Sequence, residues 1–212
     1  FVFKIAYFVF FVCNFHVKFV HAAVSDRAYV ASFNAFFTRE LRAGIRPIAT
    51  GEEVIVSPVD GAISQLGPII GQSIVQAKGR SYTVEELLGG DKALAEQYQQ
   101  GQFATIYLSP RDYHRIHMPI AGKLKSMRYV PGKLFSVNPR TARAVPRLFA
   151  RNERVICVFD TDFGDVTLVL VGAIFVGSME TVWAGQITPP YGKSIQNLTS
   201  EGDATVCIEK RS

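Results

Sequence analysis

Short apolar segments separated by glycine and proline dominate the chain from residue 54 onwards. Many of them alternate apolar with polar side chains or are rich in β-branched and aromatic residues, which is typical of β-strands. The pattern therefore predicts a β-rich body. The predicted strands cover residues 54–56, 62–66, 73–77, 103–108 and 122–130.

Two further strands are predicted at 154–159 and 166–175, which are rich in β-branched residues. They flank the segment 160–164, so we interpret them as a hairpin with a longer loop. This hairpin is the predicted core.

Two short helices interrupt the strands. Thr83 and Glu86 have the spacing of a capping box, which predicts the start of the first helix. The second is predicted to run from Asp91 to a stop at Gly101. We expect both helices to be peripheral additions to the β-rich body.

The first 20 residues are apolar and aromatic, but interspersed polar residues leave only 5–13 uninterrupted. That stretch is too short for a membrane-spanning helix. Aromatic rings with scattered lysines favour a segment that lies in the membrane interface. Two alternatives remain, because residues 15–19 alternate as in a strand and residues 20–23 resemble the cleavage site of a signal peptide.

Phe33, Phe36 and Phe37 fall on one face of a predicted helix that has Ser32 as its candidate N-cap. We interpret this element as a membrane-docking helix. The chain is therefore predicted to divide into a helical, membrane-associating lead at 1–47 and a β-rich domain at 48–212.

The net charge of +5 is unevenly distributed. Residues 111–154 hold eleven basic side chains against only Asp112 and Glu153. This excess favours an anionic partner, and an anionic membrane attracts each Lys or Arg by about 1 kcal/mol. A solvated basic face and a nucleic acid are the alternatives, although no nucleic-acid-binding motif accompanies the charge. The three scattered cysteines argue against a disulfide framework and favour a reducing compartment.

Asp60 lies in the segment 57–61, Ser-Pro-Val-Asp-Gly. Aspartate and glycine are common in tight turns, so the segment by itself indicates a strand end and a turn. The alternative is that the Asp60 carboxylate orients a histidine and stabilises its protonated form.

His114 and His117 lie three residues apart between Pro110 and Pro119, which disfavour a regular helix. We therefore expect a constrained loop. The spacing permits a metal site, but a third ligand is lacking nearby. Imidazoles among basic side chains favour proton transfer on an anionic substrate near neutral pH, and a structural role in the loop is the alternative.

Four segments occur in order along the chain: FFTRELR at 36–42, PVDG at 58–61, LSPRDYHRIHMP at 108–119 and YVPGKLFSVN at 129–138. Their order and sequence resemble those of the prokaryotic phosphatidylserine decarboxylases. The resemblance extends over roughly residues 24–190.

The resemblance implies an α+β fold, with N-terminal membrane-docking helices followed by a β-rich, barrel-sandwich-like catalytic body. It implies an enzyme whose aspartate and histidine, here Asp60 and His117, activate a serine that becomes a covalent pyruvoyl group. His114 is assigned to substrate binding and proton delivery. The pyruvoyl group forms a Schiff base with phosphatidylserine, which loses CO2 and becomes phosphatidylethanolamine. Ser136 and Asn138 are the candidates for hydrogen bonds to the headgroup.

The family's processing motif, Leu-Gly-Ser-Thr, does not occur in these 212 residues. The pair Gly177-Ser178 matches a different position of the family, so we reject it as the cleavage site. Ser212 follows Arg211 rather than a glycine, and the serine that becomes the pyruvoyl group is expected beyond Ser212. No residue of the chain is therefore assigned to hold the cofactor.

We expect the chain to need a missing C-terminal segment that bears the pyruvoyl group, and to be inactive without it. A partial sequence of an active enzyme is the favoured explanation, and a catalytically inactive lipid-binding pseudoenzyme is the alternative.

The resemblance also implies partners and a location. The expected partner is phosphatidylserine in an anionic membrane, with no nucleic acid and no metal. The expected location is peripheral, on the cytoplasmic face of a bacterial inner membrane. An oligomer is compatible with these expectations.

Overall fold

The structure is a computed structural model that describes residues 33–51, 54–174, 176–198 and 207–208. It forms two compact units. The division predicted at residue 48 stays a prediction. Of the described residues, the first unit holds those of 33–62 and 108–120, and the second unit holds those of 63–107 and 121–208.

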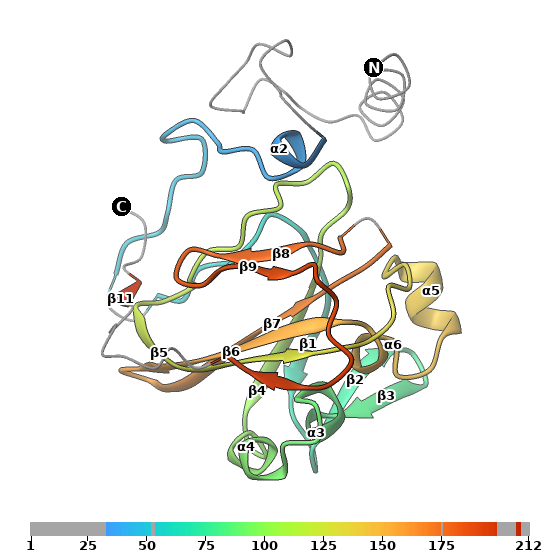
Figure 1. Ribbon diagram of the computed structural model, residues 1–212. Helices are drawn as coiled ribbons and strands as arrows, with labels where there is room; N and C mark the ends of the chain where they lie inside the picture. Colours follow the sequence, from blue (N-terminus) through green and yellow to red (C-terminus); the bar gives the residue numbers. More distant parts are fainter. Residues whose placement is uncertain (1–32, 52–53, 175, 199–206, 209–212) are drawn as a thin grey trace, which may run out of the picture. The chain divides into compact units, whose positions relative to one another are not determined.

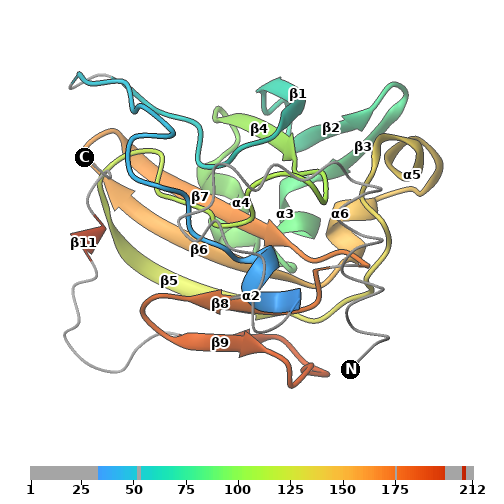
Figure 2. The ribbon, with the colours of Figure 1, turned by 90° about the horizontal axis from the view of Figure 1, so that it is seen from above.

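The largest sheet of the second unit is an antiparallel meander. Strands β5 (Gly122–Val130), β6 (Arg154–Thr161) and β7 (Gly164–Val171) lie side by side in it (Figure 1 and Figure 2). The short strands β10 (Gln196–Asn197) and β11 (Cys207–Ile208) both pair with β5. The strand predicted at 122–130 is confirmed with the same bounds.

Strand β6 provides the middle of the core. Its five consecutive apolar residues from Val155 to Phe159 are each at most 3% exposed. An uninterrupted apolar run is expected where both faces of a strand are covered. The prediction that this strand lies in the core is therefore confirmed.

The hairpin between β6 and β7 turns more tightly than predicted, so the longer loop at 160–164 is wrong. The two strands pair as far as Thr161 and Gly164, which leaves Asp162 and Phe163 as the turn. Gly164 has a φ of +97°, a value that glycine adopts readily. The Thr161 hydroxyl donates to the Gly164 carbonyl oxygen over 2.6 Å and accepts from the Phe163 N–H over 3.2 Å. These local bonds close a turn of two residues.

Helix α3 (Val84–Leu87) begins at the predicted capping box. The Thr83 hydroxyl accepts from the Glu86 N–H over 3.1 Å, and the Glu86 carboxylate accepts from the Thr83 N–H over 2.9 Å. The reciprocal bonds satisfy two backbone donors that the first turn of a helix leaves unpaired.

The expectation that both helices are peripheral is wrong. Val84, Leu88 and Ala95 are at most 3% exposed and belong to the hydrophobic core. Helix α4 (Lys92–Gln97) also ends earlier than the stop predicted at Gly101. Each helix therefore buries an apolar face, which decides its place more strongly than the polar caps do.

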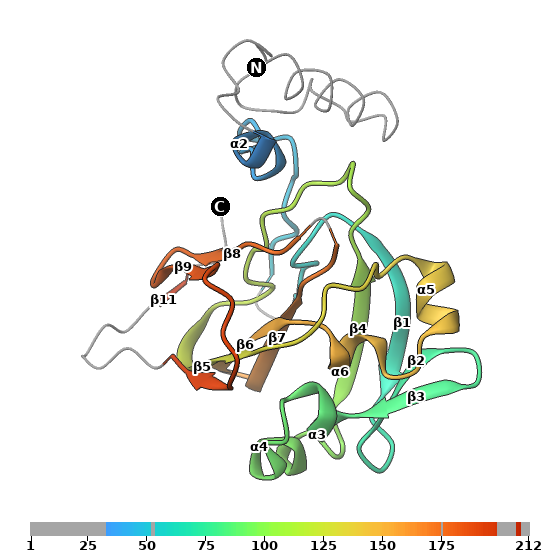
Figure 3. The ribbon, with the colours of Figure 1, turned by 45° about the vertical axis from the view of Figure 1, so that its right-hand side comes forward.

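The other strands of the second unit form two-stranded sheets (Figure 3). None of the sheets closes into a barrel among the described residues, so the predicted barrel-sandwich-like body is confirmed only as β-rich. The strand predicted at 73–77 is confirmed. The remaining pairs are β1 (Ala62–Pro68) with β4 (Gln102–Tyr107), β2 (Ser73–Ala77) with β3 (Arg80–Thr83), and β8 (Met179–Thr181) with β9 (Gly185–Thr188); the remaining helices of this unit are α5 (Pro139–Ala144) and α6 (Leu148–Arg151).

Helix α2 (Phe33–Phe37) of the first unit confirms the predicted helix, while its predicted cap Ser32 and the apolar segment 1–20 lie outside the described residues. Phe36 and Phe37 are 1% and 6% exposed, so these two rings pack inside the protein. Membrane docking by this helix stays a prediction. In the part of the chain that the structure describes, no helix is both long and apolar enough to cross a bilayer.

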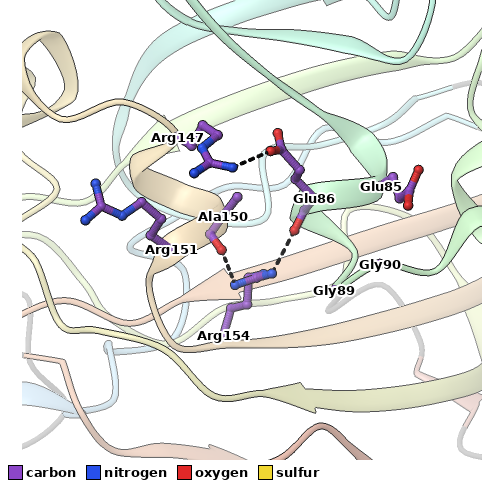
Figure 4. A pocket seen from close by; sticks show the side chains of 8 residues that line it. All are labelled: Glu85, Glu86, Gly89, Gly90, Arg147, Ala150, Arg151 and Arg154. Carbon is purple, nitrogen blue, oxygen red and sulfur yellow. Dashed lines mark hydrogen bonds and ion pairs between the residues drawn. The ribbon is translucent and has the colours of Figure 1, made fainter.

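A pocket of about 360 Å³ lies between α3 and α6 (Figure 4). Arg147 binds the Glu86 carboxylate at its rim over 2.9 Å. Arg154 lies deeper, is 2% exposed and donates to backbone carbonyl oxygens of both helices. The pocket is therefore lined by two exposed arginines, Arg147 and Arg151, and by the buried Arg154.

Candidate active site

The loop 108–120 of the first unit carries both histidines and begins with a tight turn. The Asp112 N–H donates to the Ser109 carbonyl oxygen over 2.8 Å, and the Asp112 carboxylate accepts from the Ser109 N–H over 2.7 Å. Pro110 occupies the second position of this turn, where its fixed φ is favourable. The turn fixes the position of the backbone directly before Tyr113 and His114.

A short antiparallel pairing joins this loop to the segment that carries the aspartate. The Val56 N–H donates to the Pro119 carbonyl oxygen over 3.0 Å, and the His117 N–H donates to the Pro58 carbonyl oxygen over 2.9 Å. Both acceptor residues are prolines, which have no N–H to donate in return. The pairing therefore stays incomplete, and the strand predicted at 54–56 does not form.

Tyr113 holds the ring of His117. The Tyr113 hydroxyl oxygen lies 2.9 Å from His117 Nε2. The two rings stack with centroids 5.6 Å apart and an interplanar angle of 16°. If Nε2 carries the proton, it donates to the tyrosine and leaves Nδ1 as the basic nitrogen; the other tautomer reverses these roles. In both cases Tyr113 orients the imidazole.

The second histidine, His114, is held as a neutral ring. Its Nδ1 lies 2.9 Å from the Asp112 carbonyl oxygen. A carbonyl only accepts, so Nδ1 carries the proton and Nε2 of the neutral ring keeps its lone pair. The Phe37 ring covers this imidazole with centroids 3.9 Å apart. Burial lowers the pKa of His114 and outweighs the backbone carbonyl and the charge of Asp112, which both raise it.

His114 is expected to titrate below the ordinary histidine pKa of about 6.5. The unfolded chain then takes up this proton first on acidification, so the group lowers stability as the pH falls through about 6.5 towards the folded pKa. The measurement is an NMR titration of the ring protons, with the signal assigned by its loss in His114→Gln. A midpoint at or above 6.5 contradicts the prediction.

The carboxylate of Asp60 forms an ion pair with Arg46. Arg46 Nε lies 3.0 and 2.8 Å from the two carboxylate oxygens, and Nη2 lies 2.5 Å from Oδ2. The Asp60 side chain is 29% exposed and the Arg46 side chain is 43% exposed. Hydrogen bonding to Asp60 raises the pKa of Arg46. The aspartate is thus fixed as the anionic member of a pair, and its role towards a histidine stays a prediction.

Arg115 ties the histidine loop to the segment that follows α2. Its Nε donates to the Thr38 carbonyl oxygen over 2.7 Å, and its Nη1 binds the Glu40 carboxylate over 2.6 Å. Phe37, the last residue of α2, covers His114. Contacts from the end of α2 and from the segment that follows it therefore hold the loop in place.

Ser136 and Asn138, the headgroup candidates, lie in the second unit and contact each other. Asn138 caps α5 by accepting from the Thr141 N–H over 2.9 Å. Its amide donates to the Ser136 hydroxyl oxygen over 2.9 Å. Because Ser136 accepts this bond, its own proton remains available to an acceptor. Asn138 has a structural function as a cap, and binding of a headgroup by either residue stays a prediction.

The serine that is expected to become the pyruvoyl group would follow Ser212. Ser212, beyond which the pyruvoyl serine is expected, lies outside the described residues. The expectation that this serine follows Ser212 therefore stays a prediction. The rejected pair Gly177-Ser178 is described and lies directly before β8 in the second unit.

The structure places Asp60, His114 and His117 together in the first unit. Sequence reasoning gave no orienting role to Tyr113 and no pairing role to Arg46. Tyr113 stands four residues before its histidine in the same short loop, which was the available signal. The partner of Asp60 lies 14 residues away along the chain, and no local pattern distinguishes it from the other arginines.

A model of the phosphatidylserine decarboxylase family matches residues 33–205. The chain is similar to the phosphatidylserine decarboxylase proenzyme of Delftia acidovorans, with 62% identity over 92% of the chain and 68% of that protein. The proenzyme of the same name from Vibrio parahaemolyticus is 54% identical over 94% of the chain and 71% of its own length. The one from Alkalilimnicola ehrlichii is 56% identical over 94% and 69%.

Proposed function

Because the chain belongs to the phosphatidylserine decarboxylase family, we propose that Asp60, His114 and His117 perform its chemistry. The reaction is that of a carboxy-lyase: phosphatidylserine loses CO2 and becomes phosphatidylethanolamine. The observation that supports these residues best is the backbone bond from His117 to Pro58. It brings the histidine loop and the segment of Asp60 into register, as a shared site requires.

The word proenzyme in the names of the relatives fits a cofactor made from the protein itself. When present, a pyruvoyl group supplies a carbonyl that condenses with the substrate amine and withdraws the electron pair that decarboxylation releases. A carboxylate and an imidazole within one unit fit the making of this group, because a serine is a weak nucleophile until a base removes its proton. Asp60 and His117 are the residues for that task, and the serine itself is proposed to follow Ser212.

His117 is proposed as the base for the serine hydroxyl. The Tyr113 hydroxyl, 2.9 Å from Nε2, orients the ring, and the ring nitrogen that carries no proton is the one that takes the serine proton. The imidazolium that forms is stabilised by a nearby anion, as in other sets of nucleophile, base and acid. Asp60 provides this negative charge, moderated by its ion pair with Arg46.

His114 is proposed to move a proton during decarboxylation. The carbon that loses CO2 must gain one proton, and the Nε2 lone pair of a neutral imidazole can take up a proton and pass it on. Burial lowers the pKa of His114, which keeps the ring neutral near pH 7. Ser136 and Asn138 are proposed to form hydrogen bonds to the headgroup, and the Asn138 amide also orients the Ser136 hydroxyl.

The substrate is a membrane lipid, so we propose a peripheral location on the cytoplasmic face of a bacterial inner membrane. The basic excess in residues 111–154 supports attraction to an anionic surface. The apolar lead and α2 are the proposed docking elements. The division into a lead at 1–47 and a decarboxylase domain at 48–212 belongs to the same proposal.

The proposal is tested with liposomes that contain phosphatidylserine labelled with ¹³C in the serine carboxylate. The self-processed form of a longer precursor, which includes the proposed C-terminal segment, is expected to release labelled CO2 and to form phosphatidylethanolamine in equal amounts. The variant with both His114→Gln and His117→Gln is expected to release none. Lipid binding without release of CO2 by the wild-type protein argues instead for the non-catalytic lipid-binding alternative.

A further inference from the structure

Arg39 lies in the first unit directly after α2, and its guanidinium is only partly satisfied. Its carbon Cζ lies 5.2 Å from the centroid of the Phe36 ring. Its Nη1 donates to the Phe36 carbonyl oxygen over a long 3.4 Å. Its Nε is buried and has no hydrogen-bond partner within the described part of the chain.

A guanidinium carries five N–H donors and usually finds acceptors for most of them. A buried donor without an acceptor costs free energy, and the cost is larger for a charged group. Burial also lowers the pKa of Arg39, while Tyr113, Asp112 and Asp60 act in the opposite direction. An arrangement of this kind is favourable once an anion provides the missing acceptors.

Arg39 lies close enough to His114 for its positive charge to affect the imidazole. Phe37, two residues before it, lies against the His114 ring with centroids 3.9 Å apart. The positive charge of Arg39 lowers the pKa of His114, and the negative charge of Asp60 raises the pKa of Arg39. The guanidinium therefore lies among the residues to which we assigned the chemistry.

Three other arginines among the described residues of this unit differ from Arg39. Arg46 is engaged by the Asp60 carboxylate, and Arg115 is engaged by Glu40 and a backbone carbonyl. The side chain of Arg111 is 62% exposed. Arg39 combines partial burial with a buried donor that lacks an acceptor among the described residues.

We propose that Arg39 is the residue that binds the phosphodiester of the lipid headgroup. This inference rests on the proposed function, because that function supplies the substrate. Phosphatidylserine carries two anions, the phosphodiester and the carboxylate, and a planar guanidinium can bind either through two parallel hydrogen bonds.

The phosphodiester is the better match for a physical reason. The carboxylate loses its charge as CO2 leaves, so a guanidinium bound to it stabilises the substrate more than the transition state and slows the reaction. The phosphodiester keeps its charge throughout. It is also only three bonds from the carbon that loses CO2, so an anchor for it must lie close to the group that returns the proton, which is His114.

The first test measures binding of monomeric dihexanoyl lipids to the 212-residue chain by calorimetry. Phosphatidylserine and phosphatidylethanolamine share the phosphodiester, but only the former has the carboxylate. Arg39→Met is expected to bind both lipids about 10- to 100-fold more weakly than the wild type. Arg39→Lys, which keeps the charge without the planar fork, is expected to lie in between. Arg42→Met removes the same charge from an exposed side chain of the same segment and serves as the matched control.

The outcomes separate the alternatives. Equal affinity of Arg39→Met and the wild type overturns the inference, as does a loss confined to phosphatidylserine, which assigns Arg39 to the carboxylate. An equal loss in Arg42→Met overturns it as well, because general attraction then explains the binding. Matching circular dichroism and melting curves verify that Arg39→Met is folded.

A kinetic test keeps this inference separate from the proposed function. In the self-processed enzyme, Arg39→Met is expected to cleave itself normally and to show a KM raised by about 10- to 100-fold with a smaller change in kcat. An unchanged KM in an active enzyme contradicts the role of Arg39 alone. A wild-type protein that processes itself but releases no CO2 contradicts the proposed function instead.

Discussion

Replacing His117 with alanine is expected to stop self-processing, and decarboxylation is expected to fall by about 10³-fold or more. The reason is that the imidazole is the proposed base for the serine, and without the base the hydroxyl stays a weak nucleophile. Processing is measured as the conversion of the precursor into two chains on a denaturing gel. Decarboxylation is measured as CO2 released from phosphatidylserine liposomes.

His114→Ala is the informative comparison, because it removes an imidazole from the same loop. The proposed roles differ in time: His117 acts when the cofactor is made, and His114 acts when the substrate is turned over. His114→Ala is therefore expected to process itself and then to decarboxylate slowly. If His117→Ala also processes itself at the wild-type rate, the base is a different residue.

Tyr113 connects this prediction to the observed geometry. Its hydroxyl lies 2.9 Å from His117 Nε2, and Tyr113→Phe removes that bond while it keeps the stacked ring. A neutral hydrogen bond contributes about 1 kcal/mol, so processing is expected to slow by roughly tenfold or less rather than to stop. A complete block in Tyr113→Phe contradicts the view that the tyrosine only orients the ring.

Arg154→Met is expected to lower the free energy of unfolding by about 3–5 kcal/mol, the largest stability effect expected here. Arg154 is 2% exposed. Its guanidinium donates to four backbone carbonyl oxygens that lie on α3, on α6 and after α6. Figure 4 shows two of these bonds, those to Glu86 and Ala150. The acceptors are those of Glu86, Leu87, Ala150 and Asn152, at 2.8, 2.6, 2.8 and 2.8 Å.

The expected loss of stability is the difference between two free energies, the cost of the unpaired carbonyls and the cost of the buried charge. Burial lowers the pKa of Arg154 to about 10, and a shift of this size corresponds to a cost of roughly 3 kcal/mol for keeping the charge inside. Four carbonyls that lose their donor cost about 1–3 kcal/mol each. The free energy lost with the four hydrogen bonds is therefore larger than the free energy gained by removing the buried charge of Arg154.

Arg147→Met is the matched control, because Arg147 lines the same pocket. Its ion pair with Glu86 spans 2.9 Å, but the two side chains are 60% and 34% exposed. Exposed ion pairs contribute at most about 1 kcal/mol. Urea unfolding, followed by circular dichroism, compares the two variants. Equal losses in both variants, or a loss below about 1 kcal/mol in Arg154→Met, contradict the prediction.

The strands were predictable where their patterns are local. Alternating or continuous apolar residues marked β2, β5 and β6, because burial on one or both faces of a strand imposes those patterns on the chain itself. The capping box at Thr83 was predictable for a similar reason, since both of its bonds join residues three apart. The family was recognisable because four segments keep both their order and their sequence.

Predictions failed where two distant segments decide the outcome. Residues 54–56 have the composition of a strand, but Val56 faces Pro119, and Pro58 of the same segment faces His117. Neither proline can donate the return bond. The two helices after β3 were expected to be peripheral, yet Leu88 and Ala95 are buried in the core. A short helix becomes part of the core when another element covers its apolar face, and its own residues do not show whether that happens.

The sequence by itself determined the family and the β-rich body, and it selected Asp60, His114 and His117 as candidates, because each of these depends on the identity and order of neighbouring residues. Only the tertiary structure decided their surroundings. It paired Asp60 with Arg46, set Tyr113 against His117 and covered His114 with Phe37. These contacts depend on how the chain folds back on itself, and they set the burial, ring orientation and hydrogen-bond partners of these residues.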